Sequence, residues 1–398
     1  MNLPLQQHGE LPAGARPARG ATRDRAGQAG ALRIAFAIVS LFPGGGLQRN
    51  CLAIARILRR RGHDVVIFTS RATGPLAEDV RVEVLPNRAW TNHGRNRRFS
   101  KDLAKATARN FDLVVGFDKL PGLDLVYCAD PATAARRGWR RLTPRYRALR
   151  ALEAACFGTG KNTRIIALSP AQIEGYRRAW HTEPHRVALL PPNIEPERRH
   201  PERRRDGTRE NRRAALALDT QDWCWLAIGR QAKHKGFDRA VAALPEFPHA
   251  RLFIAGLAES DPAARKLLAL ARKLAVADRL VLMGFVPDAE FSDLMAAADL
   301  LVHPARADTT GTVILEALVN GLPVVTTAVC GYAGHVREAD AGAVVPEPFA
   351  QEALVAALRE AGGERAARWS ANAARYGERP ELYSGLEVAA DIILGARS

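Results

Sequence analysis

Short apolar runs alternate along this chain with longer segments in which apolar residues recur every three or four positions. The first run, "LRIAFAIVS", begins at Leu32 and is followed by the amphipathic segment "NCLAIARILRRRG". Apolar runs separated by helical segments are typical of parallel strands joined by crossover helices. In the first half the pattern predicts strands at "LRIAFAIVS", "DVVIFT", "RVEVLP", "FDLVVGF", "LDLVYCA", "TRIIALS" and "RVALLP". We therefore expect an α/β fold with a doubly wound parallel sheet.

The alternation stops at residues 190–213, which are rich in Pro and Arg and poor in apolar residues. It resumes with "WCWLAIG", "ARLFIAG", "RLVLMGFV", "DLLVHPA", "LPVVTT" and "AGAVVP", which predict a second α/β unit of similar size. A chain of 398 residues is also long for one core. We expect a disordered basic tail over 1–30, an N-terminal domain over 31–190 and a C-terminal domain over 191–398. The last stretch, about Pro380 to Leu394, is predicted to be a helix that returns to the N-terminal domain.

Composition narrows the class of protein. The chain is 47% hydrophobic and 25% charged, and no apolar run approaches the roughly 20 residues that a membrane-spanning helix needs. The first 30 residues lack the apolar core of a secretory signal. The cysteines form no C-x-x-C pair, so they favour neither a zinc site nor a disulfide framework and fit a reducing cytosol: Cys51, Cys128, Cys156, Cys224 and Cys330.

The net charge is +16, and arginines outnumber lysines by 50 to 8. This excess indicates an anionic partner, although arginine richness can also reflect coding bias. Nucleic acid is disfavoured, because no helix-turn-helix, finger spacing or aromatic RNA-binding motif accompanies the charge.

A glycine turn, "FPGGGLQRN", lies between the first predicted strand and the helix after it. Glycines there can take positive φ and let the backbone approach a phosphate or a sugar. The turn lacks the G-x-G-x-x-G spacing and the acidic partner of a dinucleotide site. A plain tight turn is the alternative.

The segment "HPARADTTGTVILEALVNGLPVVTT" carries the clearest candidate chemistry. After a predicted strand, Asp308, Thr310, Gly311 and Thr312 open a helix, whose free N–H groups suit a diphosphate. Glu316, one turn into that helix, can accept hydrogen bonds from a ribose diol, and Asp308 can face a sugar hydroxyl. The alternative is an Asp N-cap followed by a solvated Glu.

A second segment, "IGRQAKHKGFDRA", places Arg230 and Lys235 after another predicted strand. Two cations beside backbone donors are suited to a leaving diphosphate, whose negative charge grows as the bond breaks. The alternative is two solvated loop cations. Together the two segments predict a site for a nucleoside diphosphate.

The pattern G-R-x4-K-G, followed some 70 residues later by D/E-x7-E within "HPA…LEAL…GLPV", resembles the donor half of the family 4 glycosyltransferases, which have the GT-B fold. The segments "FPGGGLQRN", "TNHGRN", "VVGFDKLPGLD", "LTPRYR", "LLPPNIEP", "LMAAADLLVHPA" and "LPVVTTAVCGYA" resemble the branch that adds glucose from UDP-glucose to an inner-core heptose of lipopolysaccharide. The resemblance spans roughly residues 33–395. It implies two Rossmann-like domains facing an interdomain cleft. Two positions depart from it: Asp308 stands where the family has Glu, and His234 where the branch has Arg.

The resemblance also implies roles for residues of the first half. The glycines of the turn would lie against the donor sugar and its β-phosphate: Gly44, Gly45 and Gly46. Asp130 would lie beside the reacting anomeric carbon, and the acceptor would be faced by His93, Arg95 and Lys119. The alternatives are a strand-end cap for Asp130 and a self-contained loop for "NHGRN".

The implied reaction retains the anomeric configuration, and the departing phosphate oxygen takes the proton of the acceptor hydroxyl. The resemblance implies no metal and no cofactor, because Arg230, Lys235 and the helix start would neutralise the charge. One alternative is a transferase that uses another nucleotide sugar, such as UDP-galactose or UDP-N-acetylglucosamine, or another acceptor. A second is a non-catalytic basic protein that binds nucleic acid or membrane.

The segment "RRGWRRLTPRYRALRAL" contains seven arginines and no acidic residue. Thr143 and Pro144 predict the N-cap and first residue of a helix. Ahead of them lie residues suited to anionic lipid headgroups: Arg136, Arg137, Trp139, Arg140 and Arg141. We therefore expect a cytoplasmic protein held peripherally on the inner face of the cytoplasmic membrane. A solvated helix face is the alternative.

Overall fold

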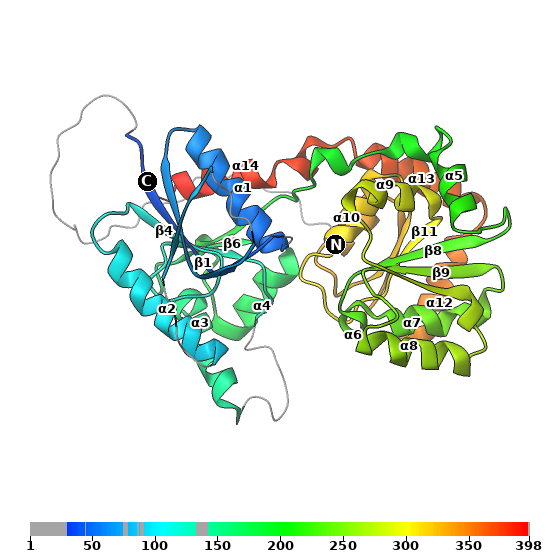
Figure 1. Ribbon diagram of the computed structural model, residues 1–398, viewed down its shortest axis with the longest axis horizontal. Coiled ribbons are helices and arrows are strands. Elements are labelled where there is room, and N and C mark those ends of the chain that lie inside the picture. Colours follow the sequence, from blue (N-terminus) through cyan, green and yellow to red (C-terminus); the bar gives the residue numbers. More distant parts are fainter. Residues whose placement is uncertain are drawn as a thin grey trace. The chain divides into compact units, whose positions relative to one another are not determined.

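The computed structural model describes residues 30–396, apart from residues 44, 75–78, 86, 88–90 and 133–141. The chain divides into two compact units, each built on one parallel sheet (Figure 1). Unit 1 contains the chain up to Ala167, Ile173–Leu190 and the residues from Leu386 onward. Unit 2 contains Leu168–Gln172 and Pro191–Gly385. The predicted α/β class with two parallel-sheet domains is confirmed.

Unit 1 has a seven-stranded sheet in the order β3-β2-β1-β4-β5-β6-β7. Every neighbouring pair is parallel. The seven apolar runs predicted for the first half each form one strand. The inner strands are largely buried because helices cover both faces, whereas the edge strands β3 and β7 are partly exposed. The strands are β1 Arg33–Leu41, β2 Asp64–Ala72, β3 Arg81–Val84, β4 Leu113–Gly116, β5 Leu125–Cys128, β6 Arg164–Ala167 and β7 Val187–Leu189.

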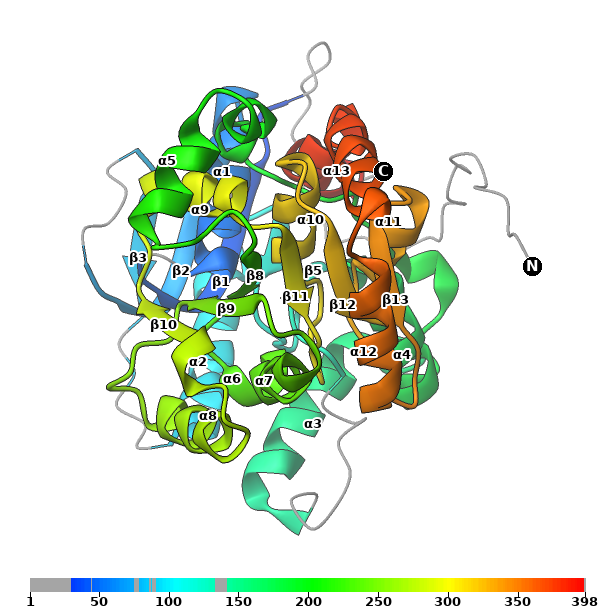
Figure 2. The same ribbon diagram turned by 90° about the vertical axis from the view of Figure 1, so that its right-hand side faces the viewer.

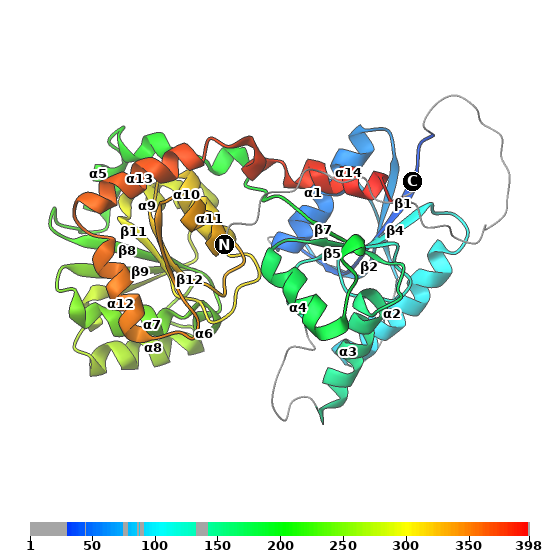
Figure 3. The ribbon, with the colours of Figure 1, turned by 180° about the vertical axis from the view of Figure 1, so that it is seen from behind.

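Two helices of this sheet begin after a threonine whose side chain caps them. Thr143 caps α3 by accepting a hydrogen bond from the Tyr146 amide, and Pro144 is its first residue, as predicted. The last helix belongs to unit 1 and lies beside the first helix of that unit (Figure 3). Arg61 forms ion pairs with Glu387 and Asp391 there, at 2.5 and 2.6 Å. The helices are α1 Gly46–Arg60, α2 Asn92–Thr107, α3 Pro144–Phe157, α4 Pro170–Trp180 and α14 Gly385–Leu394.

The predicted continuous helix from Pro380 is wrong. A 3₁₀ turn occupies Pro380–Tyr383, and α14 starts only at Gly385. A Cβ atom at Gly385 would lie 2.5 Å from the carbonyl oxygen of Pro191, so the backbone packs against another chain segment there. This close approach lies at the break between the 3₁₀ turn and α14.

Unit 2 has a six-stranded parallel sheet in the order β10-β9-β8-β11-β12-β13 (Figure 2). All six runs predicted for the second half form its strands. Two hydrophobic clusters pack on the two faces of this sheet. The strands are β8 Trp223–Ile228, β9 Ala250–Ala255, β10 Leu280–Gly284, β11 Leu300–His303, β12 Val324–Thr327 and β13 Gly342–Val345.

Helices connect these strands and cover the two faces of the sheet. They are α5 Thr208–Ala215, α6 Ala232–Lys235, α7 Phe237–Ala243, α8 Pro262–Lys273, α9 Asp288–Ala297, α10 Thr312–Val319, α11 Ala333–Glu338, α12 Gln351–Glu360 and α13 Glu364–Tyr376. Short 3₁₀ turns occupy Pro184–Arg186, Pro196–Arg198, Pro201–Arg204, Leu244–Glu246 and Ala277–Arg279.

The arginine-rich segment that interrupts the sequence pattern is folded onto unit 2. Arg204, Arg209 and Arg213 donate to backbone carbonyls at the C-terminal end of α9, where cations complement the helix dipole. Arg209 and Arg213 also form ion pairs with Asp299. Part of the basic excess therefore has a structural role, which the composition could not indicate.

Candidate functional site

The site in unit 2 lies at the carboxyl ends of β11 and β12, where ligands bind in open α/β sheets. The loops that follow these strands are joined by a β-bridge between Asp308 and Cys330. The Gly331 amide donates to the Asp308 carbonyl at 3.2 Å, and the Tyr332 amide donates to the Thr310 carbonyl at 2.7 Å. These bonds hold the two loops as one rigid platform.

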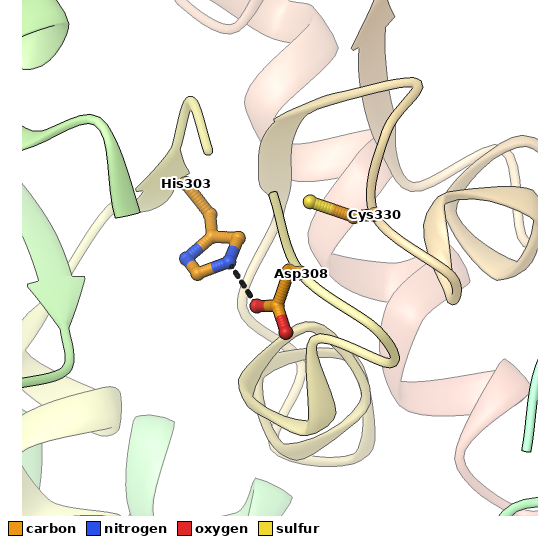
Figure 4. Close-up of side chains that lie close together, drawn as sticks. All are labelled: His303, Asp308 and Cys330. Atoms are coloured by element: carbon orange, nitrogen blue, oxygen red, sulfur yellow. Dashed lines mark hydrogen bonds and ion pairs between the residues drawn. The ribbon is translucent and has the colours of Figure 1, made fainter. Parts of the chain in front are cut away.

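Asp308 is the centre of this platform (Figure 4). Its Oδ2 atom lies 2.9 Å from Nε2 of His303 and 2.6 Å from Nζ of Lys235. Burial alone would raise the pKa of Asp308, but the hydrogen bond from His303 and the charge of Lys235 lower it to about 2. Asp308 is therefore a carboxylate at neutral pH, with one oxygen held by two donors.

Lys235 reaches Asp308 because the chain turns sharply after β8. Gly229, which follows the strand, has φ 145°, a backbone conformation that favours glycine. A Cβ atom at Gly229 would lie 3.0 Å from Cγ of Lys235, so the lysine stem packs directly on this glycine. Lys235 ends the short helix α6, whereas Arg230 is exposed. Only Lys235 of the two predicted cations contacts Asp308.

The start of α10 rules out the alternative of an Asp N-cap, and the anion site stays a prediction. Gly311, with φ 75°, is the N-cap residue, and none of the described side chains caps the helix. Asp308 is therefore not a helix cap. The hydroxyls of Thr310 and Thr312 lie 3.4 Å apart at this end, and no acidic residue lies in the first turn. Uncapped amides at a helix start suit an anionic ligand, and the charge of the Asp308 carboxylate beside them is balanced by Lys235.

Glu316 lies one turn into α10, as predicted, but it has a partner that the sequence analysis missed. Arg198 donates to its Oε1 atom at 3.0 Å. The two side chains are only 13% and 17% exposed. Arg198 also binds Glu195 and Asp288, at 3.1 and 3.0 Å. Arg198 fixes the orientation of Glu316. No sequence motif indicated this contact.

His303 and Cys330 were also missed. Both are buried, and with Asp308 they bring three potential ligand atoms within 4.8 Å of one another, the one such group found in the described part of the chain. Among the described residues, the buried Nδ1 atom of His303 has no hydrogen-bond partner, whereas metal-bound histidines normally donate from their second nitrogen. Lys235 already supplies the charge that balances Asp308. The geometry suits a positioned carboxylate better than a metal centre.

The residues predicted for the first half belong to unit 1. Asp130 lies two residues after β5 and is exposed, and its carbonyl accepts hydrogen bonds from Tyr176 and Cys128. Lys119 donates to the fully buried Glu153 at 2.7 Å and to the Pro131 carbonyl at 2.9 Å. Its ammonium therefore already has structural partners. Its acceptor role stays a prediction.

The motif "TNHGRN" is helical, so the loop alternative is wrong. Thr91 caps α2 by accepting from the Gly94 amide, which places His93 and Arg95 in the first turn. The structure does not describe the His93 side chain. Arg95 lines a polar cavity together with Asp118, a residue that the sequence analysis did not select.

The glycine turn leads directly into α1. Gly45 is the N-cap residue with φ −83°, so the expected positive φ is wrong at this position. Gly46 begins the helix, and Gly44 lies outside the described residues. The candidate membrane segment also lies outside them: Arg136, Arg137, Trp139, Arg140 and Arg141. Among the helices that the structure describes, none has the length and apolar character needed to cross a membrane.

Comparison with known proteins places the chain in a family. The model for Glycosyltransferase Family 4 matches residues 44–198, and the model for Glycosyl transferases group 1 matches residues 208–376. Lipopolysaccharide glucosyltransferase WaaG of Escherichia coli (strain K12) is 40% identical over 375 residues, which cover 91% of this chain and 98% of that protein.

Comparison with solved structures supports the same family. The crystal structure of WaaG, a glycosyltransferase involved in lipopolysaccharide biosynthesis, matches with a TM-score of 0.81 and 38% identity, covering 91% of this chain and 100% of that one. HepE of Anabaena, in complex with UDP-glucose, matches with a TM-score of 0.70 at 18% identity and covers 92% of this chain and 100% of its own, which shows a shared fold. The chain therefore belongs to the family 4, group 1 glycosyltransferases and is a GT-B enzyme of this family.

Proposed function

We propose that this enzyme transfers glucose from UDP-glucose to an inner-core heptose of lipopolysaccharide. The proposal is supported by the similarity to WaaG along almost the whole length of both chains. The observation that carries it is the Asp308 platform, with Lys235 and the start of α10 beside one carboxylate. These are the groups that a nucleotide-sugar donor requires.

In the proposed reaction the bond between the anomeric carbon of glucose and the β-phosphate oxygen breaks, and the acceptor oxygen bonds to that carbon on the same face. The acceptor proton passes to the departing phosphate oxygen, and UDP leaves. Lys235 and the amides of α10 stabilise the charge that grows on the diphosphate, and Arg230 lies on the same strand-end loop. They take the place that a metal ion has in other transferases.

Asp308 has two functions in this proposal. Its Oδ2 atom orients Lys235 and accepts from His303, while Oδ1 has no hydrogen-bond partner among the described residues. We assign Oδ1 to a hydroxyl of the donor sugar. Glu316, oriented by Arg198, would bind the ribose. Asp130, Gly45 and Gly46 keep the roles that the family resemblance implies.

A transferase for another UDP sugar is the second candidate, because Asp308 is one methylene shorter than the Glu of the family. We also propose that the enzyme works at the cytoplasmic face of the membrane, where its lipid-linked acceptor would be held. The basic segment from Arg136 to Arg141 would supply the contact with anionic headgroups.

A donor panel tests the proposal. Purified enzyme is incubated with UDP-glucose, UDP-galactose or UDP-N-acetylglucosamine and with lipopolysaccharide core truncated after the inner-core heptoses, and the released UDP is measured. We expect acceptor-dependent release with UDP-glucose to exceed that with the other donors by about tenfold or more, the scale of one donor hydrogen bond. A preference for another sugar would support the second candidate.

A further inference from the structure

The corner of the chain that carries Lys235 is a short piece of regular structure. Lys235 is the last residue of α6, a helix of four residues, and helices this short are not stable by themselves. Gly236 follows with φ 70° and joins α6 to α7 in the left-handed conformation. The position of the Lys235 ammonium therefore depends on contacts that hold this corner from outside the helix.

Arg306, in the loop after β11, makes such contacts on both sides of Lys235. Its backbone amide donates to the His234 carbonyl at 2.7 Å. Its guanidinium donates to the Lys233 carbonyl at 3.2 Å and to both carboxylate oxygens of Asp238, at 2.6 Å each. One arginine thus binds the two residues before Lys235 and the first turn of α7 after it.

The contact between Arg306 and Asp238 has the geometry of a strong ion pair. Two parallel hydrogen bonds between a guanidinium and a carboxylate fix the orientation of both groups. Burial opposes ionisation of Asp238, but the hydrogen bond and the charge of Arg306 outweigh it and lower the pKa of that carboxyl below its ordinary value of 3.8. The side chains are 34% and 41% exposed and belong to neither hydrophobic cluster of unit 2, so the core does not depend on them.

A second arginine holds the same two segments together. Arg239, on α7, donates to the carbonyls of Pro304 and Ala305 at 3.1 Å each. A Cβ atom at Gly236 would lie 2.0 Å from the carbonyl oxygen of Pro304, so the two backbones pack directly on each other. The corner and the loop after β11 therefore form one unit.

The loop that contains Arg306 also carries the partner of Lys235. Asp308 follows Arg306 by two residues, and its Oδ2 atom lies 2.6 Å from the Lys235 ammonium. A shift of the corner would change the distance between this ammonium and the carboxylate. Misplacing a catalytic group by about 1 Å can lower a rate about a hundredfold.

We infer that Arg306, paired with Asp238, is a positioning residue that holds the Lys235 ammonium where the diphosphate of the donor binds. The inference rests on the proposed function, in which Lys235 stabilises the charge that grows as the diphosphate leaves. Arg306 acts through Lys235 and is assigned no contact with the substrate.

Variants of the pair test this role. Arg306→Ala and Asp238→Ala should each lower kcat for UDP release roughly ten- to hundredfold, while the KM for UDP-glucose changes by less than about threefold, because Lys235 matters most in the transition state. The double variant should lose no more than the larger single loss, since the two side chains act as one unit. Arg306→Lys keeps the charge but cannot form two parallel bonds, so it should recover only part of the rate.

The matched control is another partly exposed ion pair of unit 2. Arg359 binds Glu246 at 2.7 Å, and both side chains are more than half exposed. Arg359→Ala should retain the wild-type kcat. The melting temperature of each variant should stay close to that of the wild type, because partly exposed ion pairs contribute little to stability. An unchanged kcat in Arg306→Ala, or a loss of kcat that only follows a loss of stability, would overturn the positioning role.

Labelling of lysine amines separates this inference from the proposed function. Brief acylation followed by mass spectrometry compares the labelling rate of Lys235 with that of Lys273, an exposed lysine at the end of α8. Arg306→Ala should raise this ratio severalfold, because the released corner lets Lys235 leave Asp308. If the wild type released UDP from none of the donors in the panel, the proposed function would fail. The labelling ratio would then decide the inference alone: a raised ratio keeps the positioning role, and an unchanged ratio overturns it.

Discussion

Lys235 is the residue whose charge matters most as the diphosphate leaves. Lys235→Ala should lower kcat by roughly 10²- to 10³-fold, as expected for a group that stabilises the transition state. The KM for UDP-glucose should change much less. Lys233→Ala, an exposed lysine on the same helix, is the control. A Lys235 variant that raises only KM would contradict this role.

His303 orients Asp308 and lies at the end of a buried strand. His303→Leu should lower kcat, whereas His303→Gln, which can donate from a nitrogen near the position of Nε2, should recover most of it. UDP affinity should be similar in both variants, since the ribose is assigned to Glu316. Equal losses in the Leu and Gln variants would show that His303 serves packing alone.

Glu316→Gln keeps the size of the side chain and removes its charge. We expect a loss of UDP affinity of about 1.5 to 3 kcal/mol, the usual value for a hydrogen bond to a charged group. Glu195→Gln, which also removes a carboxylate bound to Arg198, is the matched control. Calorimetry that gave the same UDP affinity for Glu316→Gln and the wild type would remove the ribose assignment.

Asp118 also predicts a dependence of stability on pH. Burial, the dominant cause, raises its pKa from 3.8 to about 6, with Asp130 adding to the effect and Lys119 opposing it. The charge of Asp118 in turn adds to the burial that raises the pKa of Cys51. The folded protein binds the proton of Asp118 more tightly than the unfolded chain does. The stabilisation that this proton gives the folded state is complete below pH 3.8 and is lost as the pH rises through about 6.

Asp118→Asn should therefore be more stable than the wild type at pH 7.5, and the difference should vanish near the ordinary carboxyl pKa of about 4. The amide oxygen can still accept from the Val39 amide, so the backbone bond is kept. Urea unfolding across this pH range measures the effect. A difference that does not change with pH would show that the carboxylate carries no burial penalty.

At the scale of elements, apolar runs were sufficient to predict every strand of both sheets, because buried parallel strands are nearly continuous in hydrophobicity. The start of α10 was predicted from Gly311 and its flanking threonines. The contacts of Glu316 with Arg198 and of Lys119 with Glu153 were not predictable, because they join residues 118 and 34 positions apart. Apart from its position at the end of a predicted strand, nothing in the sequence indicated a role for His303.

At the scale of the whole molecule, the basic excess has more than one origin. Arginines of the segment after residue 190 bind the C-terminal end of α9, so they are not available to a membrane. Replacing Arg136, Arg137, Arg140 and Arg141 with Ser should abolish sedimentation with anionic vesicles and spare UDP binding, since each charge near the surface contributes about 1 kcal/mol. Wild-type binding should also be lost in high salt. A variant that sediments like the wild type would exclude this segment as the contact.

The proposed function is transfer of glucose, with retention, from UDP-glucose to lipopolysaccharide core. It can be tested by NMR of the product formed from UDP-glucose labelled with ¹³C in the sugar and core truncated after the inner-core heptoses. We expect one new labelled glucose on the core, with the α configuration of the donor. A β linkage, or label found only in free glucose, would contradict it.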